Sequence, residues 1–246
     1  MTQEQLSQIA QSRGIQYFLI SFTDLFGVQR SKLVPAAAID AMAKSGVGFA
    51  GFAAWLALTP ADAHILAIPD PNSLFHLPWQ PDIAWMPADL YTSYGDPLEQ
   101  NPRSVLKRVL TQAEAQGYQL KTGVECEYFL VTPQGDCISD RFDQQSKPCY
   151  DQQALMRRYE VIRDICDGMQ ALGWGPYQND HEDANGQFEM NWDYADALVT
   201  ADRHAFFKYM VKSIAEKHGL RATFMPKPFR NLTGNGCHVH LSLWNL

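Results

Sequence analysis

The stretch that decides the fold is GVECEYFL, residues 123–130, a strand-like run that carries two carboxylates two positions apart. Successive side chains of a strand point to opposite faces, so Glu125 and Glu127 share one face while Cys126 and Tyr128 share the other. The apolar flanks of this run indicate that it is buried. Because burying unpaired charge is costly, we expect the two carboxylates to have a cationic partner.

Two later segments repeat this alternation. The run HEDANGQFEMNW, residues 181–192, contains Glu182 and Glu189 around an Asn-Gly turn signal, which is able to bring both carboxylates to one point. The run GCHVHLSL, residues 236–243, sends His238 and His240 to one face of a strand. Taken singly, each pattern also fits a polar strand face or a buried histidine pair. Their occurrence together favours a metal site.

The ligand types select the metal. Carboxylate oxygens dominate the three segments, and the pattern does not place thiolates as ligands, which favours Mg²⁺ or Mn²⁺ over zinc. Two or more such ions suit phosphoryl transfer, because they neutralise charge on the moving group. The sequence contains neither a Walker A motif nor a Rossmann glycine motif, so any bound ATP is held in another way.

The composition is that of a globular chain of 246 residues, with 46% hydrophobic and 19% charged residues. A formal charge of −7 and the lack of a Lys/Arg cluster argue against a nucleic-acid partner. Five cysteines without a CxxC pair predict neither a disulfide framework nor a zinc ribbon, and we expect a reduced, cytoplasmic location. The longest apolar run is too short to cross a membrane.

Hydrophobic periodicity and turn signals predict an α+β chain in two parts, with a boundary in the polar stretch between them. We expect an N-terminal domain over residues 14–98 and the N-terminal part of a catalytic domain over 103–246. Helices are predicted over 2–13, 35–44, 104–116, 151–172 and 201–218, and strands over 15–23, 28–34, 65–68 and 120–132, the first two strands forming a hairpin around a turn at 24–27.

At these residues the chain resembles the glutamine synthetase family of ATP-dependent carboxylate–amine ligases. The motif-carrying runs are 123–129, 181–189, FMPKP at 224–228 and GNGCHVHLSL at 234–243, and the resemblance extends from about residue 16 to the last residue. It implies a β-grasp N-terminal domain followed by an antiparallel catalytic sheet with packed helices. It also implies a homo-oligomer of stacked rings.

The resemblance further implies roles for single residues. Glu127, Glu182 and Glu189 would hold one metal ion, and Glu125 with His238 a second. Gly234 and His238 would bind the substrate glutamate, and His240 and Ser242 would face ATP. No catalytic residue is assigned beyond these ligands. The implied reaction is ATP-dependent glutamine synthesis from glutamate and ammonia through a γ-glutamyl phosphate.

One position departs from the family pattern. Where members usually have Phe-Asp-Gly-Ser-Ser, with an Asp that attracts ammonium, this chain has FAGFA at 49–53, so Ala50 replaces the carboxylate. That change weakens the attraction for ammonium, and the runs 48–53 and 180–189 look like the branch that includes glutamate–methylamine ligases. Ammonia remains the first prediction, and a glutamate–methylamine or other γ-glutamylamide ligase is the alternative.

The chain ends directly after the His-x-His strand, whereas family members continue. We therefore expect an incomplete catalytic domain that exposes an unpaired sheet edge and is inactive as a ligase by itself. A non-catalytic assembly module and a two-metal hydrolase are further alternatives. The first keeps the fold without turnover, and the second turns over phosphoesters without an amine.

Overall fold

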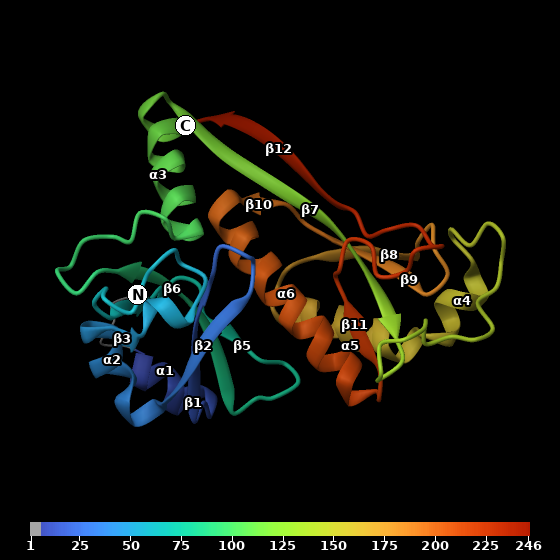
Figure 1. Cartoon of the computed structure of the whole chain (residues 1–246), viewed down its shortest axis with the longest axis horizontal. Helices are drawn as coiled ribbons and strands as arrows, with labels where there is room; N and C mark the ends of the chain where they lie inside the picture. Colours follow the sequence, from blue (N-terminus) through green and yellow to red (C-terminus); the bar gives the residue numbers. More distant parts are fainter. Residues whose placement is uncertain (1–5) are drawn as a thin grey trace. The chain divides into compact units, whose positions relative to one another are not determined.

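The computed structural model describes residues 6–246, which form two compact units, residues 6–119 with Asn245–Leu246 and Leu120–Trp244 (Figure 1). The predicted first helix begins at residue 2, and its first four residues lie outside the described part. Within residues 6–246, none of the helices is long and apolar enough to cross a bilayer.

The first unit is a mixed sheet with helices. In the described chain its strand order is β2-β1-β6-β4-β3, with β5 paired to β6, and β1 runs parallel to β6 while the other pairs are antiparallel. Its elements are α1 (Leu6–Arg13), β1 (Tyr17–Thr23), β2 (Gln29–Pro35), η2 (Ala36–Ala38), α2 (Ile39–Ser45), β3 (Val47–Phe49), η3 (Gly51–Ala53), β4 (Ile65–Pro69), β5 (Phe75–His76), β6 (Ile83–Tyr91) and α3 (Pro102–Ala115).

The predicted hairpin is confirmed, and its turn is held by one buried carboxylate. Asp24 accepts hydrogen bonds from the backbone N–H of Phe26 at 2.9 Å and of Val28 at 3.0 Å, and forms an ion pair with Arg30 at 2.8 Å. Alternate strand residues such as Phe18 and Ile20 are fully buried in the core of this unit. The β-grasp assignment stays a prediction.

The second unit is built on one long strand, β7 (Tyr118–Val131), which begins at the end of the first unit. In the described chain β7 pairs with β9, β10, β11 and β12, and β8 pairs with β9 at the other side. Figure 1 shows β12 running alongside β7. The remaining elements are α4 (Gln152–Arg157), α5 (Tyr159–Ala171), β8 (Pro176–His181), β9 (Gln187–Trp192), β10 (Ala195–Asp196), α6 (Ala197–Lys217), β11 (Arg221–Thr223) and β12 (Cys237–Asn245).

Helix α6 packs against one face of this sheet through aromatic side chains. Phe207 contacts Trp192 with ring centroids 4.8 Å apart and Tyr128 at 6.4 Å, and Phe206 contacts Trp174 at 5.9 Å. The face that β7 presents to the helix is therefore the Cys126 and Tyr128 face. The opposite face, which carries the carboxylates, does not receive this helix.

Two helix predictions in the second unit need correction. The single helix predicted over 151–172 is two helices, because Arg158 leaves the helical conformation with φ of −114°. Its guanidinium reaches back to Ser139, with Nη2 donating to the carbonyl at 2.5 Å and Nε to the hydroxyl at 2.9 Å. The last helix begins at Ala197 rather than at 201. The overall α+β class and the antiparallel second sheet are confirmed.

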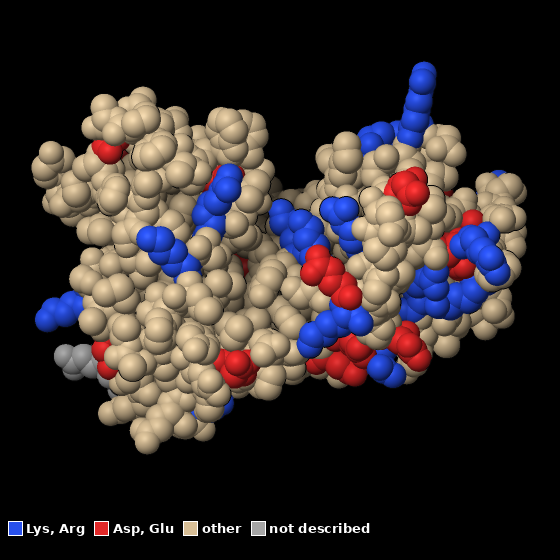
Figure 2. All heavy atoms as spheres, turned by 60° about the horizontal axis from the view of Figure 1, so that its bottom comes forward, with Lys and Arg blue, Asp and Glu red and all other residues tan. Residues whose placement is uncertain are grey.

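Strand β12 is exposed along its whole length. Its large apolar side chains lie open to solvent, including Leu241 at 67% exposed and Leu243 at 65%. On the face displayed in Figure 2, Lys and Arg side chains are scattered among Asp and Glu rather than gathered in one patch.

Candidate functional site

Three of the predicted metal ligands come together on the carboxylate face of the second sheet. One oxygen each of Glu127, Glu182 and Glu189 lies within 4.8 Å of the others. Glu127 on β7 stands directly opposite Glu189 on β9, and Asp180 on β8 is the next residue across the sheet. Four carboxylates thus crowd one region, which we call the carboxylate cluster: Asp180, Glu182, Glu127 and Glu189.

The crowding changes the acidity of the cluster. Burial, followed by the negative charges of the neighbouring carboxylates, raises the pKa of Glu189 to about 7 and that of Asp180 to about 6. Burial also raises the pKa of Glu127, against the opposing effect of a hydrogen bond from Gly236. Like charges on facing strand positions repel one another, which destabilises the cluster when no cation is bound. An all-oxygen set of this kind fits Mg²⁺ or Mn²⁺.

Donors around the cluster hold two of the carboxylates in place. Glu127 Oε2 accepts from the Gly236 N–H at 2.8 Å and from Gln187 Nε2 at 2.9 Å, and Glu189 Oε1 accepts from Asn191 Nδ2 at 3.0 Å. Gln187 is fully buried, and its amide also donates to the Gly234 carbonyl at 3.0 Å. These hydrogen bonds come from uncharged donors, so they fix the orientation of the Glu127 and Glu189 carboxylates without neutralising their charges.

The loop before β12 approaches Glu127 at close range. A Cβ on Gly236 would lie 2.5 Å from Glu127 Oε1 and 3.0 Å from His238 Nε2, so a larger residue at this position would displace the Glu127 carboxylate. His238 therefore stands on the carboxylate side of β12, as the alternation predicts.

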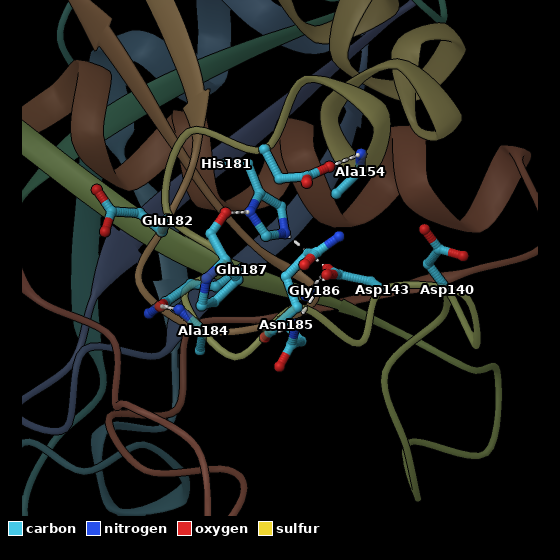
Figure 3. Close-up of polar contacts among 12 residues, drawn as sticks. Asp140, Asp143, Ala154, His181, Glu182, Ala184, Asn185, Gly186 and Gln187 are labelled. Atoms are coloured by element: carbon cyan, nitrogen blue, oxygen red, sulfur yellow. Dashed lines mark hydrogen bonds and ion pairs between the residues drawn. The ribbon is translucent and has the colours of Figure 1, made fainter.

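Glu182 is positioned by the β8–β9 turn, which a buried histidine anchors. His181 is fully buried, and its Nε2 lies 2.6 Å from Asp143 Oδ2 while its Nδ1 lies 2.7 Å from the Pro148 carbonyl (Figure 3). The carbonyl is only an acceptor, so Nδ1 carries a proton. Asp143 also accepts from the Gly186 N–H at 2.6 Å and from Asn185 Nδ2 at 2.8 Å, which ties the turn to a distant loop.

The turn itself closes through Gln187. The Glu182 N–H donates to the Gln187 carbonyl at 2.9 Å, and the Ala184 N–H donates to Gln187 Oε1 at 3.0 Å. Gly186 has a φ of +76°, and a Cβ there would meet Ile138 at 2.8 Å, so the Asn-Gly signal marks a turn that requires glycine.

Three of the other predicted residues line a neighbouring cavity of about 350 Å³. Glu125, His240 and Ser242 line it together with aromatic side chains such as Tyr194. Glu125 Oε1 lies 3.0 Å from His240 Nε2, whereas the family resemblance implies that Glu125 shares a metal ion with His238. Ser242 Oγ accepts from Trp244 Nε1 at 3.0 Å. The division of these residues between metal and nucleotide stays a prediction.

Some of the residues that shape the site were missed by the sequence analysis. Asp180 could have been found, because it stands two residues before Glu182 and so repeats the spacing of Glu125 and Glu127. No sequence pattern marks Asp143 as a partner of His181, since it lies in an irregular segment 38 residues before that histidine. A cluster of two cysteines and a histidine was missed too: Cys126, His204 and Cys237.

A family model described as "Glutamine synthetase, catalytic domain" matches residues 99–246. The chain belongs to this family. The assignment agrees with the motifs at the carboxylate cluster and the loop before β12, and it confirms the predicted family.

Relatives and solved structures extend the glutamine synthetase match to nearly the whole chain. A "Glutamine synthetase" of Rhizobium meliloti (strain 1021) is 63% identical over 241 residues, covering 98% of this chain and 55% of the relative. A "Glutamate--methylamine ligase" of Methyloversatilis universalis is 40% identical, covering 99% and 56%. A solved structure described as "GmaS/ADP complex-Conformation 1" is 68% identical with a TM-score of 0.96, covering 98% and 56%. The chain spans about half the length of the relatives it matches.

Proposed function

We propose that this chain supplies the metal-binding half of the active site of an ATP-dependent glutamate–ammonia ligase. In this reaction the side-chain carboxylate of glutamate attacks the γ-phosphate of ATP, and ammonia then displaces phosphate from the γ-glutamyl phosphate to give glutamine. The observation that carries the proposal is the convergence of Glu127, Glu182 and Glu189 within 4.8 Å, in a chain of the glutamine synthetase family.

The chain's own residues bind and align the reactants. Glu127, Glu182 and Glu189 would hold one Mg²⁺ or Mn²⁺, and Glu125 and His238 a second. Bound ions would neutralise charge on the phosphate groups during transfer. Gln187 and the Gly236 N–H support this role, because their hydrogen bonds to Glu127 Oε2 hold the carboxylate in a fixed orientation.

Substrate contacts follow from the positions of the remaining residues. His240 and Ser242 would face ATP, which is supported by their place in the 350 Å³ cavity. Gly234 and His238 would bind glutamate. The close packing of the 234–236 loop on Glu127 and Gln187 supports this assignment, since glutamate must reach the metal-bound face.

A second candidate amine is methylamine. Ala50 stands where the family pattern has a carboxylate that attracts ammonium, and the relative of Methyloversatilis universalis is named for methylamine. Removing one negative charge weakens the attraction for a small cation and admits a less polar amine. Ammonia remains our first proposal, because the relative at 63% identity is named glutamine synthetase.

At the level of the whole protein, we propose the domains 14–98 and 103–246, a homo-oligomer with active sites between subunits, and a cytoplasmic location. These proposals rest on the family resemblance. Size measurement by light scattering tests the oligomer directly.

The first experiment is a calorimetric titration of this chain with Mn²⁺ and then with ATP, alongside Glu127→Gln and the matched control Glu160→Gln. Glu160 is an exposed residue of the first turn of α5, outside the cluster. We expect clear Mn²⁺ binding by the chain and the control and a loss in Glu127→Gln. Equal binding by all three proteins would contradict the proposed site.

The second experiment separates the amines in a polypeptide of the length of the relatives that contains this chain. Glutamate and ATP are supplied with equal concentrations of ammonium and methylamine, and the amide products are identified by mass spectrometry. Glutamine as the main product supports the first proposal, and γ-glutamylmethylamide supports the second. Phosphate release without either amide would contradict both.

A further inference from the structure

Three potential metal ligands meet on the helix-covered face of the second sheet. Cys126 lies on β7, Cys237 begins β12 and His204 lies on α6. The two Sγ atoms and one ring nitrogen lie within 4.8 Å of one another. Because Cys126 alternates with Glu125 and Glu127, this thiol and histidine cluster lies on the opposite side of β7 from the carboxylate cluster.

The spacing and the donor types fit one class of ion. In tetrahedral zinc sites with bonds of about 2.3 Å to sulfur and 2.0 Å to nitrogen, ligand atoms lie about 3.5–4 Å apart. Small side-chain rotations are therefore enough to close the observed cluster on an ion. Two thiolates are soft donors and an imidazole also suits zinc, so the set favours zinc over the hard cations suited to the opposite face.

The surroundings also favour occupation by a metal. Cys126 is 2% exposed, and His204 has a buried Nδ1 without a hydrogen-bond partner, which is uncommon for a buried polar atom. Cys237 is exposed, so the site opens to solvent at one corner. That corner gives an ion a path of entry and leaves room for a water molecule as fourth ligand.

Neighbouring charges do not forbid such an ion. Lys208, one helical turn after His204, acts electrostatically on all three residues and opposes a cation. The two thiolates formed on binding offset both charges of a divalent ion, so the occupied site is neutral. Glu189 and Glu127, which act on the cysteines from the other side of the sheet, add negative charge nearby.

We propose that Cys126, His204 and Cys237 form a binding site for Zn²⁺, separate from the carboxylate cluster. The ion displaces the two thiol protons and links three elements that are distant in sequence. It fastens β7, which carries Glu125 and Glu127, to β12, which carries His238 and His240. The site is independent of the proposed ligase reaction, since none of its three ligands belongs to the proposed substrate or Mn²⁺ sites.

The test is a titration of the reduced chain with Co²⁺, which reports thiolate ligation through a near-ultraviolet sulfur-to-cobalt charge-transfer band, followed by competition with Zn²⁺. We expect the band in the wild type and its loss in Cys237→Ser, with Zn²⁺ affinity weakened more than about tenfold, since even outer-shell changes cost about this much. Cys137→Ser, which removes another exposed cysteine, is the matched control and should keep the band.

Two further variants keep the result unambiguous. Glu182→Gln should keep the charge-transfer band while losing Mn²⁺ binding, which separates this site from the carboxylate cluster. His204→Gln should weaken binding, and circular dichroism checks that it folds. A wild-type chain without the band under reducing conditions would overturn the proposal. So would an unchanged band in Cys237→Ser, or a Cys126–Cys237 disulfide that resists reduction.

Discussion

Replacing Glu182 by Gln should make the metal-free chain more stable while abolishing its stabilisation by Mn²⁺. The substitution keeps the shape of the side chain and removes one of three carboxylates that meet within 4.8 Å. Most substitutions destabilise a protein, so an increase in stability is a specific signature of relieved repulsion.

The magnitude follows from the geometry. Two unit charges 4.8 Å apart at an effective dielectric constant of about 20 repel by about 3 kcal/mol, and Glu182 faces two partners. The repulsion actually relieved is smaller, because water reaches the half-buried Glu182 and Glu189 is partly protonated near neutral pH. We therefore expect a gain of about 1–2 kcal/mol in the free energy of unfolding.

The assay is urea unfolding with and without Mn²⁺, followed by tryptophan fluorescence and circular dichroism at pH 7. Mn²⁺ at 100 times its dissociation constant should stabilise the wild type by about 2.7 kcal/mol and Glu182→Gln by almost nothing. The control is Asp183→Asn, the same charge change one residue on, outside the cluster and with its contact to Thr233 preserved by an amide oxygen. A less stable metal-free Glu182→Gln that still responds to Mn²⁺ would refute the reasoning.

Three further outcomes are expected. Asp143→Ala should destabilise the chain by about 3 kcal/mol, because it strips a buried hydrogen-bonded partner, whereas the exposed Asp167→Ala should change the urea midpoint little. Gly186→Ala should lower the stability more than Gly173→Ala. Both glycines have a positive φ, but only a Cβ at position 186 meets a neighbour, Ile138 at 2.8 Å. Equal decreases in the thermal unfolding temperature would contradict this prediction. The folded-state pKa of Glu189, about 7 against an ordinary 4.5, means that the metal-free fold binds more protons than the unfolded chain. Its stability should fall as pH rises from 4.5 to about 7, while Mn²⁺ affinity increases over the same range; a Glu189→Gln variant with an unchanged pH profile would count against this assignment.

Local patterns predicted much of the second unit. The two-residue spacing correctly separated Glu125 and Glu127 from Cys126 and Tyr128, and the latter two are 2% and 0% exposed against the helix face. The Asn-Gly signal correctly indicated the turn between β8 and β9. These features depend on neighbours within a few residues, which is the range over which alternation and turn chemistry act.

Such local patterns do not predict contacts between segments that are distant in the sequence. The break at Arg158 arises because its guanidinium binds Ser139, 19 residues earlier, and helical periodicity continues across the break. The anchoring of His181 by Asp143 depends in the same way on where an irregular loop returns to the sheet. The thiol and histidine cluster was missed because its members reach one another only through the packing of α6 on β7 and β12.

The strand β7 also limits how this protein is able to change its length. One face of the strand serves the carboxylate cluster and the other faces α6 through Cys126 and Tyr128, while four further strands pair along its edges. Insertion or deletion of a single residue within 123–129 would exchange the two faces, moving acids under the helix and aromatic rings into the acidic site. A substitution here alters one side chain, but a one-residue shift of the strand moves every side chain after it to the opposite face. Length variation should therefore be confined to the loops, and a library of single-residue insertions should show 123–129 as a continuous block of intolerance.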